Sequence, residues 1–260
     1  MSETTLHFKT ITELADLIKT KALSPVEVTE AMLSRIREQD PLYKSYATVM
    51  AEQAMASAQA AEQAIYAGNY LGPLHGVPIA VKDLCYTKGV ATMGATKALA
   101  NNVPDFDCTV VEKLNAAGAV ILGKLNLTEG AMAGYNPEFQ VPVNPWGANL
   151  WSGASSSGSG VATSAGLCYG SLGSDTGGSI RFPSAACGIV GIKPTWGRVS
   201  RYGVLALAES LDHIGPMTRS AADAGIILQA MAGLDPNDPT TLTAPVPDML
   251  EGIGQGVRGL

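Results

Sequence analysis

The sequence predicts an α/β fold in which a central sheet is covered by helices. Helical periodicity alternates along the chain with short apolar segments of strand length. The stretch 76–83 (GVPIAVKD) places apolar side chains at alternate positions, and 118–123 (GAVILG) is a continuous apolar run typical of a buried strand. Helix and strand signals continue to alternate through residue 191, which favours a sheet with helices packed on it.

The first 70 residues are predicted to be helical and to pack on the core. Apolar residues recur at positions i, i+3 and i+4 within 14–18. The motif 24–27 (SPVE) combines an N-cap serine, a proline at the first helical position and a glutamate at the third. We expect that helix to end at the Asp-Pro pair 40–41, and an alanine-rich helix to follow over 50–67.

Residues 71–260 are expected to form the α/β core, so that the whole chain is one domain. A last helix is predicted from Ser220, as its N-cap, to about Met231. The final residues, 256–260 (GVRGL), look like the approach to another strand. We therefore expect the chain to be the N-terminal portion of a longer enzyme, with the C-terminal part of the fold missing.

Composition excludes several classes of function. The net charge of −6 gives no electrostatic footprint for nucleic acid, and basic residues are scattered, so no membrane-binding patch is expected. The start of the chain lacks a signal-peptide pattern, and no apolar run has bilayer length. These features predict a cytoplasmic protein.

The cysteines do not predict a metal site. None belongs to a CxxC pair or has a histidine at zinc-like spacing; they are Cys85, Cys108, Cys168 and Cys187. Without a secretion signal, buried free thiols are expected rather than disulfides.

Two segments rich in small residues are the unusual part of the chain. Residues 152–160 (SGASSSGSG) have the composition of a flexible linker, and 173–181 (GSDTGGSIR) follow after a helix of small residues. Both lie between core-like apolar segments, which does not suit a linker. Small residues in a core indicate that a backbone or a substrate must come close.

The common nucleotide and hydrolase motifs are absent. The chain contains no GxxxxGK[ST], no GxSxG and no SxxK. A Ser-His-Asp triad would need His7, His75 or His213; the first lies near the N-terminus, and the other two are in Gly/Pro-flanked turns that favour a structural role. What remains is Lys82, on a strand beside small residues, together with many serines. A Ser-Ser-Lys arrangement would use them.

At this point several motifs resemble the amidase signature family. They are 76–83, the serine-rich stretch around Ser155, 173–183 (GSDTGGSIRFP), 187–200 (CGIVGIKPTWGRVS) and 210–217 (SLDHIGPM). The likeness extends in order from about residue 10 to about residue 235. It implies a single α/β fold with a mixed central sheet covered by helices on both sides, and an amidase that needs no cofactor or metal.

The resemblance also implies a role for each site residue. Ser179 would attack the carbonyl carbon, Ser155 would accept its proton, and Lys82 would accept the proton of Ser155. The developing oxyanion would be held by four backbone N–H groups, those of Thr176, Gly177, Gly178 and Ser179. The family has glycine before the shuttle serine, where this chain has Ala154, so the choice of Ser155 over Ser156 stays open.

Lys82 must be neutral to act as a base. The ordinary pKa of lysine is about 10.4, and burial among small residues would lower it. Asp83 is expected to point away from Lys82 and so not to restore the charge. Asp175 and Arg181 are expected to form a structural ion pair.

The predicted function is hydrolysis of the acyl C–N bond of a small or aryl carboxamide, or of a related anilide or hydrazide. Met132 and Ala133 are candidates for the acyl pocket, with a core role equally open. A homodimer is compatible with the sequence, and the expected partner is a small-molecule amide. One alternative is an amidotransferase A-type subunit that generates ammonia for tRNA-dependent amidation, although residues 130–135 and 139–141 depart from its pattern. The other is a non-catalytic binding protein with the same fold.

Overall fold

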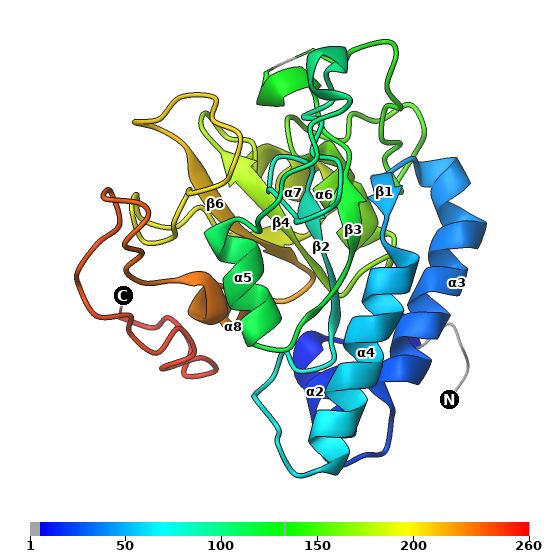
Figure 1. Cartoon of the computed structure of the whole chain (residues 1–260). Helices are drawn as coiled ribbons and strands as arrows, with labels where there is room; N and C mark the ends of the chain where they lie inside the picture. The colour runs from blue at the N-terminus through cyan, green and yellow to red at the C-terminus, as the bar shows by residue number, and fades with distance from the viewer. Residues whose placement is uncertain (1–5, 133, 260) are drawn as a thin grey trace.

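A six-stranded mixed sheet forms the centre of the protein in the computed structural model, which describes residues 6–132 and 134–259 (Figure 1). The strand order is β1-β3-β2-β4-β6-β5. The central strands β3, β2 and β4 are parallel, while β1, β6 and β5 pair antiparallel with their neighbours. The strands are β1 Tyr46–Val49, β2 Pro78–Lys82, β3 Val120–Leu125, β4 Gly170–Asp175, β5 Val190–Gly191 and β6 His213–Thr218. The predicted mixed α/β sheet is confirmed.

Helices cover both faces of this sheet. A Cβ on Gly170 would lie 2.6 Å from Ile227 of α8, whereas one on Gly173 would lie 3.0 Å from Ser156, just before α6. Residues 170 and 173 face opposite sides of a strand. The helices are α2 Ile11–Lys19, α3 Pro25–Tyr43, α4 Ala51–Tyr66, α5 Thr109–Ala116, α6 Ser157–Ser164, α7 Arg181–Cys187 and α8 Ala221–Met231, with 3₁₀ turns η1 Lys97–Leu99 and η2 Glu129–Ala131.

The predicted helix starts are confirmed, but one predicted end is wrong. Ser24 forms a full capping box, and the side chain of Ser220 accepts the N–H of Asp223. Helix α3 continues through Pro41 to Tyr43, rather than ending at 40–41. A proline in the last turn removes only one backbone hydrogen bond, and Lys44 in the left-handed conformation then ends the helix.

Strand β1 was not predicted, because the first 70 residues were expected to be helical. It pairs with β3, so that Tyr46 lies opposite Leu125 and Val49 opposite Gly123. The N–H of Met50 also donates to the carbonyl of Leu122 at 2.8 Å. The N-terminal segment therefore contributes a strand to the sheet as well as helices that pack on it.

The central strands are buried on both faces. All residues of β2 and β3 are buried, so the alternation expected for 76–83 does not divide an inner from an outer face. All four cysteines are buried and free, as expected. No helix within the described ranges is long and apolar enough to cross a membrane.

Candidate active site

The candidate site lies where β2 and β4 end. These strands are parallel neighbours, so their carboxyl ends meet at the same edge of the sheet. Lys82 is the last residue of β2 and Asp175 the last of β4. The segment that holds Ser155 and leads into α6, and the segment 175–181 that leads into α7, meet here: the N–H of Ser156 donates to the carbonyl of Ser179 at 3.3 Å.

Three serine hydroxyls surround the amine of Lys82. The Nζ atom lies 2.7 Å from Oγ of Ser155, 2.9 Å from Oγ of Ser156 and 2.8 Å from Oγ of Ser174. The peptide bond between Ala154 and Ser155 is cis. Both Ser155 and Ser156 thus reach Lys82, a feature that the sequence left open.

Burial lowers the pKa of Lys82 to about 7, with smaller opposing effects from Cys85, Asp175 and Asp212. The side chain is 1% exposed, so the charged form loses its hydration. No carboxylate in the described parts of the chain forms an ion pair with it. The expected route to a neutral lysine is therefore present in the structure.

This pKa predicts how stability depends on pH. Between about pH 7 and the ordinary lysine pKa of 10.5, the unfolded chain binds a proton that folded Lys82 does not, so the burial cost of Lys82 decreases as pH rises. In Lys82→Met this cost is absent. Urea unfolding measures the difference in the free energy of unfolding between Lys82→Met and the native chain. This difference should decrease by on the order of 3 kcal/mol between about pH 6.5 and about pH 9.5. A pH-independent difference would contradict the lowered pKa.

Asp83 is engaged elsewhere, as predicted. Its Oδ1 lies 3.3 Å from Nζ of Lys124, and its Oδ2 accepts the N–H of Met93 at 3.0 Å. Lys124 is fully buried in β3 and also donates to the carbonyl of Cys85 (2.6 Å) and to Oγ1 of Thr92 (2.7 Å). This pair was not predicted, and its only signal in the sequence was a lysine within the apolar strand 120–125 (VILGKL).

The segment that holds Ser179 wraps around the carboxylate of Asp175. This carboxylate accepts both Nε and Nη2 of Arg181 at 3.0 Å, and the N–H groups of Gly178 (2.8 Å) and Ile180 (3.2 Å). Burial would raise the pKa of Asp175, but these hydrogen bonds outweigh it and lower the pKa. The predicted structural ion pair is confirmed, and it holds Ser179, which is half-buried, at the start of α7.

The backbone N–H groups that were expected to bind an oxyanion have different surroundings in the structure. The N–H of Gly178 is already donated to Asp175. Gly178 has φ +127°, and a Cβ there would lie 2.3 Å from the ring of Phe182, so the position requires glycine. Gly177 is exposed with open space around it, and within the described residues no acceptor is bonded to its N–H or to that of Ser179.

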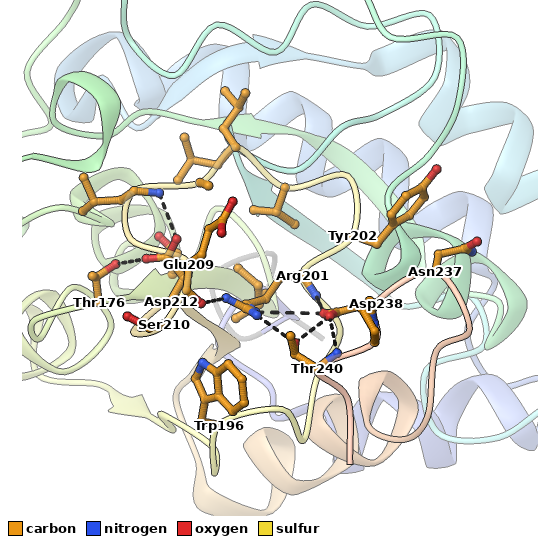
Figure 2. Close-up of a pocket in the computed structure, with 18 residues that line it drawn as sticks. Thr176, Trp196, Arg201, Tyr202, Glu209, Ser210, Asp212, Asn237, Asp238 and Thr240 are labelled. Carbon is orange, nitrogen blue, oxygen red and sulfur yellow. Dashed lines mark hydrogen bonds and ion pairs between the residues drawn. The ribbon is translucent and has the colours of Figure 1, made fainter. Parts of the chain in front are cut away.

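A cavity of about 570 Å³ adjoins the site (Figure 2). Ser174 and Thr176 line it, whereas Lys82, Ser155 and Ser179 do not. Most of its wall comes from 201–214, a segment whose role was not predicted from the sequence. The wall is largely apolar, through Leu84, Trp196, Val204, Leu205, Leu207 and Ile214.

Asp212 joins the cavity wall to the segment 175–181, which holds Ser179. It accepts the hydroxyl of Thr176 at 2.5 Å and the N–H groups of Leu207 (2.8 Å) and Ala208 (3.0 Å). Figure 2 shows Thr176 and Asp212 joined in this way at one side of the cavity. Asp212 therefore fixes the cavity wall beside Thr176.

The remaining predicted residues are placed as follows. Met132 is 61% exposed and does not line the cavity, and Ala133 lies outside the described residues. His75 accepts the N–H of Leu71, and His213 contacts backbone carbonyls and Lys193. In the described ranges no group of three His, Cys, Asp or Glu residues could hold a metal ion.

Comparisons with known proteins identify the family of this chain. The Amidase family model matches residues 27–260. "Putative amidase AmiD" of Mycobacterium tuberculosis is 59% identical over 238 residues, which cover 92% of this chain and 50% of that protein. The A-type subunit of the glutamyl-tRNA(Gln) amidotransferase of Geobacter metallireducens is 51% identical over 253 residues, 96% of this chain and 52% of that protein.

The fold also matches solved structures. Native peptide amidase from Stenotrophomonas maltophilia superposes with a TM-score of 0.88 at 36% identity, over 93% of this chain and 51% of that one. This chain spans about half the length of the curated relatives that it matches. With a family model that covers nine-tenths of its residues, the chain belongs to the amidase family, as its motifs indicated.

Proposed function

We propose that this chain carries the acylating centre of an amidase that hydrolyses the C–N bond of a small or aryl carboxamide, anilide or hydrazide. The observation that carries the proposal is the buried Lys82, whose pKa is lowered to about 7 and whose amine lies 2.7 Å from the hydroxyl of Ser155. A neutral amine in contact with a serine hydroxyl is a base aimed at that hydroxyl.

The proposed reaction has two steps. Ser179 Oγ bonds to the carbonyl carbon while its proton passes to Ser155 and that of Ser155 passes to Lys82. The tetrahedral intermediate then expels the amine, which takes a proton back through the same relay, and leaves an acyl group on Ser179. Water, deprotonated by the relay, releases the carboxylate and restores Ser179.

The oxyanion of the intermediate would be held by backbone N–H groups of the segment 175–181, which holds Ser179. We assign this role to Thr176, Gly177 and Ser179, since the N–H of Gly178 is bonded to Asp175. Gly178 instead permits the turn of the segment. No side chain blocks the approach at Gly177.

The mostly apolar cavity beside Thr176 favours an apolar or aryl group on the substrate. Met132 remains a candidate for the acyl pocket and has an exposed side chain. This chemistry would require only the residues of the site, the substrate and water, and it would take place in the cytoplasm. Whether two copies associate does not enter the mechanism.

A second candidate function is that of an ammonia-generating amidotransferase component. It is favoured by the 51% identity to the A-type amidotransferase subunit of Geobacter metallireducens. The two functions differ in what they need. The amidase should hydrolyse a simple aryl amide with no partner protein, ATP or tRNA, and dependence on all three would favour the amidotransferase.

Treatment with a fluorophosphonate, followed by mass spectrometry, tests the nucleophile. We expect one adduct on the native chain, located by peptide mapping on Ser179, and none on Ser179→Ala. Ser34→Ala removes a hydroxyl of α3 that bonds to Glu38 rather than to any site residue, and this variant should label like the native chain. An adduct that persists in Ser179→Ala, or its absence from the native chain, would contradict the proposal.

A further inference from the structure

Three hydroxyls meet a single amine at Lys82, although the proposed relay uses only one of them. All three serines are almost completely buried, with exposed fractions of 1% for Ser155, 0% for Ser156 and 5% for Ser174. The three Nζ–Oγ distances lie between 2.7 and 2.9 Å.

The proton count at the amine decides the direction of each contact. A neutral lysine amine has two N–H groups and one lone pair, whereas the charged form has three N–H groups and no lone pair. To act as a base on Ser155, Lys82 must direct its lone pair at that hydroxyl. The two N–H groups must then point to the other two oxygens.

The Oγ atom of Ser156 can only accept a hydrogen bond from Lys82. Its Oγ is 3.2 Å from the carbonyl of Ser174, to which its hydroxyl donates, and it accepts the N–H of Ser174 at 3.2 Å. Its single proton is therefore in use, and the contact with Lys82 must be an N–H donated by the amine.

The remaining contacts, with Ser155 and Ser174, differ in their surroundings. In the described parts of the chain, Lys82 is the only bonded partner of the Ser155 hydroxyl, so its proton can point only to the amine. Ser174 lines the cavity of about 570 Å³, so its hydroxyl proton can point into that space. We propose that Ser174 is a positioning residue: with Ser156, it accepts the two N–H groups of neutral Lys82 and thereby turns the lone pair toward Ser155.

This inference rests on the proposed function for its catalytic meaning, but it also predicts an equilibrium property of Lys82. The titratable groups whose electrostatic effects reach the amine are Cys85 after β2, Asp175 at the end of β4, and Asp212. Asp175 is held by Arg181, and Asp212 by Thr176 and backbone N–H groups. None of them bonds to the amine, so the hydroxyls are its direct partners.

Removal of one hydroxyl should affect the charged amine more than the neutral one. The charged form can use three acceptors, and the neutral form only two. Ser174→Ala should therefore lower the pKa of Lys82 further, and it should also leave the neutral amine free to turn its lone pair away from Ser155. The proton relay would then be slower even at high pH.

Two measurements on the same variants test this. The first is an NMR titration of lysine labelled with ¹³C at Cε, in which the Lys82 signal is assigned by its absence from Lys82→Met. The second is the rate of fluorophosphonate inactivation across pH. For Ser174→Ala we expect a lower pKa in both and an inactivation rate at the high-pH plateau that is about tenfold lower.

Two further variants separate positioning from general damage. Ser174→Thr keeps the hydroxyl and should return the pKa and the plateau toward native values. Ser171→Ala removes another buried hydroxyl of β4, which bonds to Thr163 and the carbonyl of Ser159, and should change neither.

The outcomes distinguish the inference from the proposed function. An unchanged or raised pKa of Lys82 in Ser174→Ala, or the same effect in Ser171→Ala, would overturn the positioning role. A native chain that never labels on Ser179, yet shows the expected pKa changes, would overturn the amidase proposal and leave the arrangement of protons at Lys82 supported.

Discussion

Replacement of Lys82 by methionine is expected to slow acylation of Ser179 by about a thousandfold or more. Lys82 is the only candidate base in contact with Ser155 among the described residues, and general-base catalysis contributes roughly 10²–10⁴ in rate. Methionine is similar in length and is apolar, so it fits a site that burial has already made unfavourable for charge. The expected loss is therefore chemical rather than structural.

The second-order rate of fluorophosphonate labelling, followed by mass spectrometry, measures this loss. In the native chain the rate should rise with pH with a midpoint near the lowered pKa of about 7, because only neutral Lys82 accepts a proton. Lys97→Met, which removes an exposed lysine, should keep both the rate and the midpoint. If Lys82→Met labelled within tenfold of the native chain, the proposed base would be wrong.

The largest effect on stability is expected from Gly158→Ala. Gly158 lies in the first turn of α6, and its N–H donates to the carbonyl of Asn126 at 2.9 Å. A Cβ would lie 2.4 Å from that carbonyl oxygen, 2.6 Å from the N of Asn126 and 2.6 Å from the carbonyl oxygen of Ser45. All three are backbone atoms, so no side chain can rotate away, and the helix must separate from the end of β3.

We expect Gly158→Ala to lower the free energy of unfolding by about 3 kcal/mol or more, measured by urea unfolding. It should also slow labelling of Ser179, because α6 begins directly after Ser155 and Ser156. Gly134→Ala is the control: no atom lies within 4 Å of its added Cβ, and the change should cost less than about 0.5 kcal/mol. A Gly158→Ala chain as stable as this control would refute the close approach.

The sequence was sufficient for features that depend on local chemistry. Ser24 and Ser220 cap helices because their hydroxyls bond to N–H groups two or three residues away. The close approach of backbones that the small residues indicated is seen at Gly158, where α6 meets Asn126. The family motifs also brought Lys82 and Ser155 together correctly, since the order of such motifs reflects one shared fold.

Features that depend on distant pairing were not predictable. Strand β1 has only four residues and no periodicity of its own, and it exists because β3 offers it hydrogen bonds. Lys124 and Asp83 are far apart in sequence, and a buried lysine gives no sign of its partner. The position of Ser174 at Lys82 depends on the pairing of β2 with β4, so its role could not be inferred from its place in a family motif.

Strand β1 also decides where this protein can be divided. It lies within the N-terminal 70 residues, yet it covers the outer hydrogen-bonding groups of β3 from Gly123 to Leu125. A fragment that began at residue 71 would display that row of unpaired groups on a buried, apolar strand, which is a template for self-association. Strand β1 therefore protects β3 against aggregation, and any fragment intended to remain monomeric must keep the N-terminal segment that contains it.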